Sequence, residues 1–368
     1  MKFLALYWGH KGGGSQYSIN CIEELERLAE VHVTYTNKNH HYARFDEVKF
    51  GYKVTGFKSK LSVMRFIFTI PYHIFSLILI IKRNKIKFIY IPMTQIFSGI
   101  VVIFLKKLTD VKVIFTMHDA GTHNVTYKKI KEFLLKLDTR SADGVLFVSK
   151  HVKSQTLKKY FADIPYRIAP FGRLIDIENN ITHRTLSAVP NFLFFGKIED
   201  YKGLDLFVDA LIKLANTEKV FSFTIAGAGS IEKAVKEKIT LLKEKRQGML
   251  LNGWVSDLDL DRLHKEADIL VVPYKEASQS GVLASAQEYC LPFVCTPAGG
   301  LPEQALNNGG VVANSFKSEA ILEAMLFLLI DENYQKKVSE INIYQNALSW
   351  TPTATAIISL ATDLEAAL

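Results

Sequence analysis

The sequence predicts an α/β protein with two doubly wound parallel-sheet (Rossmann-like) domains and a cleft between them. Short apolar, β-branched runs alternate with longer amphipathic stretches along the whole chain. The alternation forms two consecutive sets of about six strands, on either side of the polar, aperiodic segment 176–190. A chain of 368 residues is long for one domain and comfortable for two. Ligands of such sheets bind beyond the carboxyl ends of the strands, so a shared ligand is expected in the cleft.

The expected strands follow one another in chain order, each separated from the next by a helical stretch or a loop. The domain boundary is expected in the polar segment, which gives domains at 1–178 and 179–349. The first set of strands is expected at 2–8, 30–36, 88–93, 112–118, 144–149 and 166–171, and the second at 191–196, 221–227, 249–254, 269–274, 292–297 and 309–314.

Composition places the chain among ordinary globular proteins, with 48% hydrophobic and 22% charged residues. The three cysteines, Cys21, Cys290 and Cys295, have no paired metal spacing, so we interpret them as buried thiols in a reducing compartment. The opening "MKFLALYWGHKGGG" is too short and too glycine-bound for a signal peptide and predicts a first strand.

The net charge of +8 is distributed unevenly. Residues 1–180 carry 28 basic and 14 acidic side chains, and the remainder carries 17 and 23. A basic half beside an acidic half indicates an anionic partner on one side only. Because the motifs of common nucleic-acid-binding folds are missing, we expect no nucleic acid and favour an anionic membrane surface.

Segment 63–87 is the candidate for that contact. Its uncharged run, Phe66–Ile81, has 16 residues, fewer than the roughly 20 that a spanning helix needs. Four basic residues follow it, at 82, 83, 85 and 87. A helix whose apolar edge rests on an anionic bilayer and a helix packed only in the core both remain open.

A glycine-rich loop follows the first strand, in "GHKGGGSQYS". Gly12, Gly13 and Gly14 leave backbone N–H groups exposed at the N-terminus of a helix expected to begin near Gln16, which suits a phosphate. The spacing does not match the dinucleotide-binding glycine fingerprint.

Two further candidate sites lie at strand ends. His118 and Asp119 end a buried strand and His123 follows, so His118 is expected to face the cleft and donate to a sugar hydroxyl. Two histidines in a loop are insufficient for a metal. Lys197 and Lys202 bracket a short loop before a helix, an arrangement that suits a diphosphate.

The stretch after the strand at 269–273 combines small residues with a new helix. Ser280, Gly281 and Val282 are expected to offer backbone N–H groups to the diphosphate. Glu288, expected on the first turns of that helix, has a carboxylate suited to the two hydroxyls of a ribose. The acids of "SDLDLDRLHKEAD" fit a helix start better than a metal site.

These residues, taken together, resemble the retaining glycosyltransferases of family 4, which have the GT-B fold. The resemblance covers nearly the whole chain, and "SWTPTATAII" is similar to the helix, here about 350–368, that returns to the acceptor-side N-terminal domain. Seven segments occur in the family's order: the glycine loop, "HDAGTH", "ADGVLFVSKHVKSQTL", "FFGKIEDYKGLDL", "IAGAGS", "GWVSDLDLDRLHKEADILVVPY" and "GVLASAQEYCLPFVCTPAGGLPE".

The resemblance implies roles for individual residues. Lys197 and Lys202 would hold the diphosphate of a nucleotide-sugar donor, and Glu288 would bind the ribose. His118 would lie near the donor sugar, with Gly12, Asp119 and His123 on the acceptor or sugar side; Gly13 and Gly14 would lie over the phosphates. The first glutamate of the family's Glu-x7-Glu pattern falls at Ser280, so the chain departs from the family there.

The implied activity is metal-independent sugar transfer with retention of configuration, without a cofactor, in which lysines and amides stabilise the leaving diphosphate. The implied acceptor is a glycan or a lipid-linked molecule, in cell-surface polysaccharide biosynthesis (capsule, lipopolysaccharide or exopolysaccharide). The expected location is cytoplasmic, peripheral at the inner face of the cytoplasmic membrane. Alternatives are a nucleotide-sugar epimerase of the same fold, a non-catalytic nucleotide-sugar-binding subunit and, disfavoured by the glycine spacing, a nicotinamide-dependent oxidoreductase.

Overall fold

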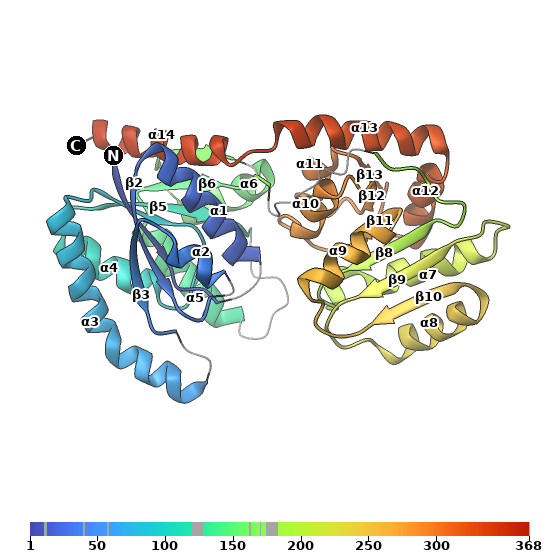
Figure 1. Ribbon diagram of the computed structural model, residues 1–368, viewed down its shortest axis with the longest axis horizontal. Helices are drawn as coiled ribbons and strands as arrows, with labels where there is room; N and C mark the ends of the chain where they lie inside the picture. The colour runs from blue at the N-terminus through green and yellow to red at the C-terminus, as the bar shows by residue number, and fades with distance from the viewer. Residues whose placement is uncertain are drawn as a thin grey trace. The chain divides into compact units, whose positions relative to one another are not determined.

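A computed structural model describes residues 1–10, 13–39, 41–56, 59–119, 128–161, 163–169, 171–173 and 183–367 (Figure 1). The chain divides into two compact units: unit 1 comprises Met1–Leu174 with Ser349–Leu368, and unit 2 comprises Ile175–Leu348. Each unit is an α/β domain built on one parallel sheet.

Unit 1 has a seven-stranded parallel sheet in the order β3-β2-β1-β4-β5-β6-β7. The strands at its centre are short, apolar and buried, as expected for a sheet covered on both faces. Its strands are β1 (Lys2–Tyr7), β2 (Glu30–Thr36), β3 (Phe50–Val54), β4 (Phe88–Ile91), β5 (Lys112–Met117), β6 (Gly144–Phe147) and β7 (Tyr166–Ile168). Its helices are α1 (Gly13–Leu28), α2 (Tyr42–Asp46), α3 (Lys60–Asn84), α4 (Ser98–Leu108), α5 (Lys128–Ser141), α6 (Lys150–Tyr160) and α14 (Thr351–Ala366).

Unit 2 repeats the architecture with six parallel strands in the order β10-β9-β8-β11-β12-β13. Its strands are β8 (Asn191–Phe195), β9 (Ser222–Ala226), β10 (Gln247–Leu251), β11 (Ile269–Val272), β12 (Phe293–Cys295) and β13 (Gly310–Val312). Its helices are the 3₁₀ turn η1 (Asp200–Lys202), α7 (Leu204–Ala215), α8 (Lys233–Lys245), α9 (Asp257–Glu266), α10 (Gly281–Glu288), α11 (Leu301–Ala305), α12 (Ser318–Leu328) and α13 (Asp331–Ala347).

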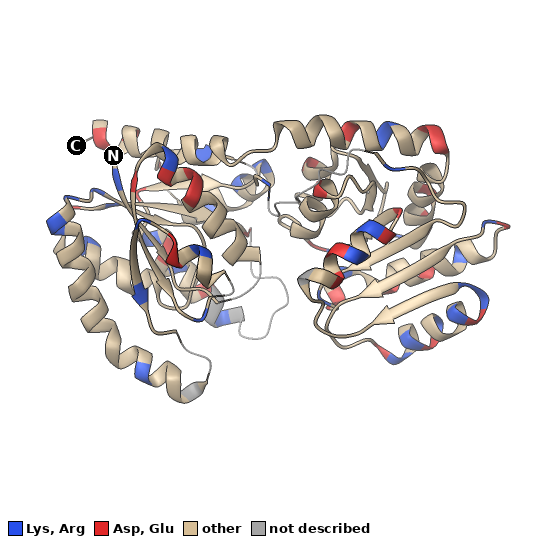
Figure 2. Ribbon diagram, viewed as in Figure 1, with Lys and Arg blue, Asp and Glu red and all other residues tan. Residues whose placement is uncertain are grey.

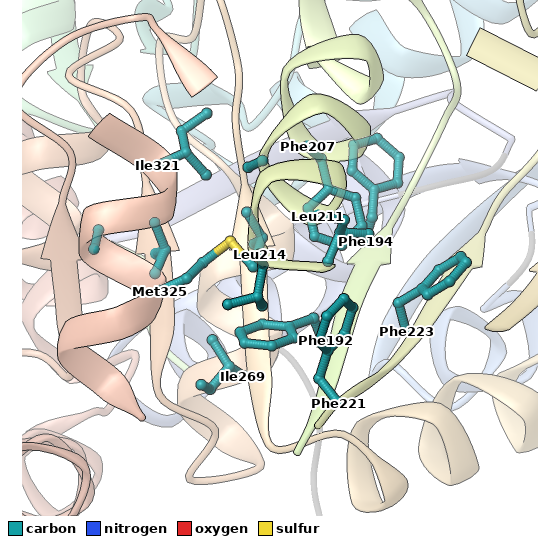
Figure 3. Packing of buried hydrophobic residues seen from close by; sticks show 14 of the residues in the cluster. Phe192, Phe194, Phe207, Leu211, Leu214, Phe221, Phe223, Ile269, Ile321 and Met325 are labelled. Carbon is teal, nitrogen blue, oxygen red and sulfur yellow. The ribbon is translucent and has the colours of Figure 1, made fainter. Parts of the chain in front are cut away.

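Close-packed aromatic and aliphatic side chains form the core of unit 2. Figure 3 shows phenylalanines of β8, β9 and α7 in one cluster with Ile321 and Met325 of α12. Phe194 and Phe207 stack with their ring centroids 6.0 Å apart. The free cysteines Cys21, Cys290 and Cys295 are all buried, as predicted. Such packing fixes the strand ends from which the loops of the site emerge.

The strand orders identify where each sheet can bind a ligand. In unit 1 the chain winds outwards from β1 in one direction and from β4 in the other. In unit 2 the corresponding pair is β8 and β11. Loops that follow such a pair diverge above the carboxyl ends of the strands and leave a crevice, which is the usual ligand site of doubly wound sheets. The predicted fold class is therefore confirmed, and it singles out two pairs of loops.

Candidate functional site

A cavity of about 350 Å³ lies at the point where β1 and β4 diverge. It is lined by residues at the end of β1 and in the segments that follow β1 and β4. They are Tyr7, Trp8, Gly9, His10, Gly14, Met93, Thr94, Gln95, Ile96 and Phe97.

Gln95 connects the two sides of this cavity. Its side-chain oxygen accepts a hydrogen bond from the backbone N–H of Trp8, and its Nε2 donates to the Leu6 carbonyl at 3.1 Å. The Trp8 indole is buried and donates to Thr34 Oγ1 at 2.8 Å. Hydrogen bonds thus tie the loops on the two sides of the cavity to each other and to the sheet.

A buried carboxyl group supports the same loop from below. Asp138 of α5 accepts a hydrogen bond from Ser98 Oγ at 2.9 Å, and Ser98 Oγ also accepts the Gln95 backbone N–H at 3.2 Å. Burial raises the pKa of Asp138 to about 7. Sequence reasoning missed this residue. The available signal was its place three residues after the buried Leu135, on the apolar face of an amphipathic helix.

The glycine loop lies beside this cavity. Helix α1 begins at Gly13, three residues earlier than the predicted start at Gln16, and Gly12 lies outside the described residues. A Cβ added at Gly13 would meet nothing within 4 Å, whereas one at Gly14 would come within 2.9 Å of Met93 Cε. The N-terminus of α1 is therefore open at Gly13 and closely packed at Gly14.

His118 follows β5 and is half-buried. Its Nε2 lies 2.8 Å from the Pro92 carbonyl oxygen, which can only accept, so Nε2 carries the proton. Burial lowers the pKa of His118, which favours the neutral ring. The remaining nitrogen, Nδ1, is then an acceptor. His118 is expected to accept a hydrogen bond from a sugar hydroxyl, and the predicted donor role is revised.

Aromatic rings fix the orientation of His118. The Tyr17 ring packs edge-to-face on the His118 ring, with the ring centroids 4.5 Å apart. The Phe171 ring stacks on the His118 ring with the centroids 6.0 Å apart. Asp119 is exposed, and His123 lies outside the described residues.

In unit 2, the loop after β8 carries both predicted lysines. Lys197 is exposed and its Nζ pairs with Glu199 Oε1 at 2.8 Å. Lys202 ends η1, and its Nζ lies 3.7 Å from the centroid of the Tyr274 ring, which follows β11. The loops after β8 and β11, the diverging pair, therefore meet at Lys202.

Close backbone approach and ion pairs hold this loop against the segment after β11. Gly203 has a φ of +68°, and a Cβ there would lie 1.9 Å from the Pro273 carbonyl oxygen, so only glycine fits. The Lys275 N–H donates to the Tyr201 carbonyl at 2.7 Å. The Lys275 ammonium pairs with Asp200 at 2.7 Å and with Asp205 at 3.1 Å.

Helix α10 begins beside these groups. Ser280 is its N-cap, but the Ser280 N–H already donates to Gln304 Oε1 at 2.7 Å, and Gln304 Nε2 donates back to the Ser280 carbonyl at 3.2 Å. The Ser280 N–H is thus engaged within the protein, contrary to its predicted role. Gly281 and Val282 form the first turn, and a Cβ added at Gly281 would meet nothing within 4 Å. This N-terminus is open to an anion.

Glu288 does not lie on the first turns of the helix, as predicted, but is the last residue of α10, because the helix has only eight residues. Its side chain is 4% exposed, and its charge acts on Tyr344 of α13. Its ribose-binding role is retained below as a proposal.

The described residues contain no group of three histidine, cysteine or acidic side chains arranged to hold a metal ion. In the acidic stretch "SDLDLDRLHKEAD", the Ser256 hydroxyl caps α9 by accepting a hydrogen bond from the Asp259 N–H at 3.1 Å. The helix start predicted there is confirmed.

Comparison with protein families matches both parts of the chain. Residues 11–173 match the model described as Glycosyltransferase Family 4, and residues 189–331 match the model described as Glycosyl transferases group 1. A curated relative is 29% identical over 137 residues: an uncharacterized 41.2 kDa protein in the cps region of Klebsiella pneumoniae. That match covers 37% of this chain and 36% of the relative, about a third of its length.

Solved structures share the fold over the whole chain. Sucrose-phosphate synthase from Thermosynechococcus elongatus superposes with a TM-score of 0.72 at 15% identity, covering 100% of both chains. Anabaena Alr3699/HepE in complex with UDP and glucose superposes with a TM-score of 0.71 at 14% identity, with 99% of both chains covered. The UDP-GlcNAc 2-epimerase of Neisseria meningitidis superposes with a TM-score of 0.62 at 14% identity, covering 99% of this chain and 100% of the epimerase.

Proposed function

The chain belongs to the GT-B glycosyltransferases, with a family 4 domain followed by a group 1 domain, and from this premise we propose that it transfers a sugar from a nucleoside-diphosphate sugar to an acceptor with retention of configuration. The observation that carries the proposal is that the loop after β8 brings Lys202 onto Tyr274, which follows β11, and lies beside the open N-terminus of α10. The loop and the helix are close there, since a Cβ added at Gly196 would come within 3.5 Å of Val282.

This arrangement suits a diphosphate leaving group. Negative charge accumulates on the diphosphate as the glycosidic bond breaks, and donors that are already in place stabilise it without reorganisation. Lys202, the Gly281 N–H and the Val282 N–H would act on the phosphates, with Lys197 at the exposed edge. Glu288 would bind the ribose hydroxyls, and no metal or other cofactor would be required. The solved structure of Alr3699/HepE with UDP and glucose supports a nucleotide sugar as the donor class.

Unit 1 would bind the acceptor in the cavity between the loops after β1 and β4. Trp8 and Phe97 offer apolar surface and Gln95 offers polar atoms, a combination typical of sites that recognise a sugar or a lipid-linked diphosphate. His118, with its accepting Nδ1, would orient a sugar hydroxyl, and Gly13 and Gly14 would place backbone amides near the phosphates.

Helix α3 supports a lipid-linked acceptor and a membrane location. Six large apolar side chains recur on one face at intervals of three or four residues and are exposed, with Phe68 at 81% and Tyr72 at 66%. The opposite face buries Phe66 and Leu77. The six exposed residues, defined here as the α3 apolar face, are Leu61, Met64, Phe68, Tyr72, Phe75 and Leu79.

The charge along α3 is positive and therefore complementary to an anionic surface. Residues 51–100 contain no acidic side chain, and Figure 2 shows basic but no acidic residues on α3. By length and composition, α3 is also the one helix among the described residues able to span a membrane, with a mean hydropathy of 1.8 over its most apolar window. Because its opposite face packs in the core of unit 1, we propose that it lies on the inner face of the cytoplasmic membrane.

The proposed setting is the assembly of a capsule, lipopolysaccharide or exopolysaccharide on a membrane-bound carrier, which agrees with the cps-region location of the Klebsiella relative. The epimerase alternative rests on the fold shared with the Neisseria enzyme. An epimerase would invert C2 of a nucleotide sugar without an acceptor, and a non-catalytic subunit would bind the nucleotide without turnover.

The first test is a thermal-shift panel with UDP, GDP, dTDP, CMP, ADP and NAD. A nucleoside diphosphate that binds only the native state raises the Tm by mass action, and the one that does so names the donor class. Release of that diphosphate from its sugar conjugates then measures transfer, and NMR of the product anomer measures retention. A shift with NAD alone, or with none of the panel, would contradict the proposal.

The matched variants are Lys202→Ala in the site and Lys236→Ala on the exposed surface of α8. We expect Lys202→Ala to abolish transfer while the protein stays folded, with a Tm at most a few degrees lower because the contact with Tyr274 is lost, and Lys236→Ala to behave as the wild type. Full activity in Lys202→Ala would refute the diphosphate role of this lysine.

A further inference from the structure

The ammonium group of Lys202 lies against the faces of two tyrosine rings. Its Nζ is 3.7 Å from the Tyr274 centroid and 4.9 Å from the Tyr201 centroid. The two rings are tilted by 70° with their centroids 6.4 Å apart. A cation within about 6 Å of an aromatic face is attracted by the negative charge of the ring face.

Each of the neighbouring lysines forms a direct ion pair with a carboxylate. Lys197 pairs with Glu199, and Lys275 lies between Asp200 and Asp205. A carboxylate fixes a lysine strongly, but it occupies N–H donors and repels an incoming phosphate. An aromatic face attracts the ammonium without adding a negative charge beside the phosphate.

The Tyr274 ring is firmly placed. It is 1% exposed and belongs to a buried cluster with Phe293, and Thr296 Oγ1 donates to the Tyr274 carbonyl. Its hydroxyl is also buried and finds no hydrogen-bond partner among the described residues. Packing in this buried cluster therefore does most to hold the ring in place.

We propose that Tyr274 is a positioning residue, whose ring holds the Lys202 ammonium in place for the donor diphosphate. The inference rests on the proposed donor site and assigns to it a residue outside the lysine, glycine and carboxylate motifs. It also assigns a share in the ammonium's position to an aromatic face at the end of β11, alongside the charge of Glu199.

The test changes the charge of the ring face while keeping its shape. Phenylalanine and its fluorinated analogues are incorporated at position 274 of the full chain. The affinity of each variant for UDP, or for the nucleoside diphosphate that the thermal-shift panel selects, is then measured by calorimetry. Each added fluorine weakens the negative ring face. We expect Tyr274→Phe to bind within about twofold of the wild type and affinity to fall stepwise with fluorination.

Tyr274→Leu removes the ring face altogether, and we expect about 5- to 30-fold weaker binding, the size of a partly desolvated cation–π contact. Phe293→Leu is the matched control: it makes the same kind of change in the same buried cluster and should lower the Tm without changing the affinity.

The outcomes separate the two proposals. If the wild type binds no nucleoside diphosphate, the proposed function and this inference both fail. If the wild type binds and the affinity is flat across the fluorinated series, the donor site stands and the role of Tyr274 is overturned. Because the fluorinated series preserves shape, this reading holds even if Tyr274→Leu does not fold.

Discussion

Asp138 has surroundings that favour its protonated form. Its folded pKa of about 7 lies above its ordinary value, so the folded protein keeps a proton that the unfolded chain releases. Stability is therefore expected to fall as pH rises from about 4 to about 7, by an amount on the order of a few kcal/mol. Asp138→Asn cannot ionise and should melt at a higher temperature than the wild type at pH 8, with little difference at pH 4.

Melting curves of both proteins between pH 4 and pH 8 measure this effect. Asp110→Asn, a change at an exposed acid of the same unit, is the control and should follow the wild type throughout. A constant difference between Asp138→Asn and the wild type at every pH would show that the carboxyl does not titrate in this window.

Substitution of His118 is expected to lower the rate of transfer. His118→Gln can retain the donation to the Pro92 carbonyl through Nε2, but its accepting atom, the amide Oε1, no longer lies where Nδ1 does. We expect kcat to fall roughly 10- to 100-fold in this variant, with a Tm close to that of the wild type. Steady-state kinetics with saturating donor measure the loss. An unchanged kcat would mean that Nδ1 does not contact the reacting sugar.

The candidate residues that sequence could single out are those whose type and position in the chain already indicate chemistry. Lys202 is a basic residue after a strand and before a helix, and His118 ends a buried strand. Tyr274 and Gln304 could not be predicted, because their importance comes from contacts with Lys202 and Ser280, which lie far away in the chain. The local pattern also placed Glu288 too early in its helix, since it does not indicate where α10 ends.

At the scale of elements, α3 carries the strongest surface prediction. Replacing Phe68, Tyr72 and Phe75 with serine removes the centre of the α3 apolar face while leaving the buried face intact. We expect binding to vesicles that contain anionic phosphatidylglycerol to fall at least tenfold, because buried apolar area supplies much of the attraction. Vesicle sedimentation measures the change, and the Tm should not fall.

Leu77→Ala on the buried face is the contrasting variant. It should destabilise unit 1 by about 2–5 kcal/mol, as large-to-small changes in a core do, while leaving the apolar face available to vesicles. Equal vesicle binding by the triple serine variant and the wild type would leave α3 as a helix of the core alone.

Elements were predictable where burial produces a simple pattern. Strands β4, β6 and β11 are four-residue runs of wholly buried side chains, and each lies within a predicted strand. Strand β3 was missed because it is an edge strand with mostly exposed residues and a glycine, so neither a buried run nor a regular alternation marks it. The two faces of α3 were left undecided because its exposed face is as apolar as its buried one.

At the scale of the whole molecule, the last helix completes the first unit. Helix α14 packs on α1, β5, β6 and β7, burying Ile357, Leu360 and Leu364. The approach is close, since a Cβ added at Gly144 of β6 would lie 3.3 Å from Leu364. Trp350, just before α14, donates its indole N–H to the Arg173 carbonyl at 2.6 Å.

A chain that ends at residue 348 should therefore lose stability in one unit only. The sheet of unit 1 would expose the apolar surface that α14 covers, an effect of several kcal/mol for three large side chains, while the sheet of unit 2 keeps its own helices. Hydrogen exchange followed by mass spectrometry measures the stability of the two units separately. Peptides from β5 and β6 should exchange faster than in the full chain, and peptides from β8 and β11 should exchange at the original rate. Equal acceleration in both sheets would mean that the two units unfold as one cooperative body, and unchanged exchange in β6 would mean that α14 adds nothing to the stability of unit 1.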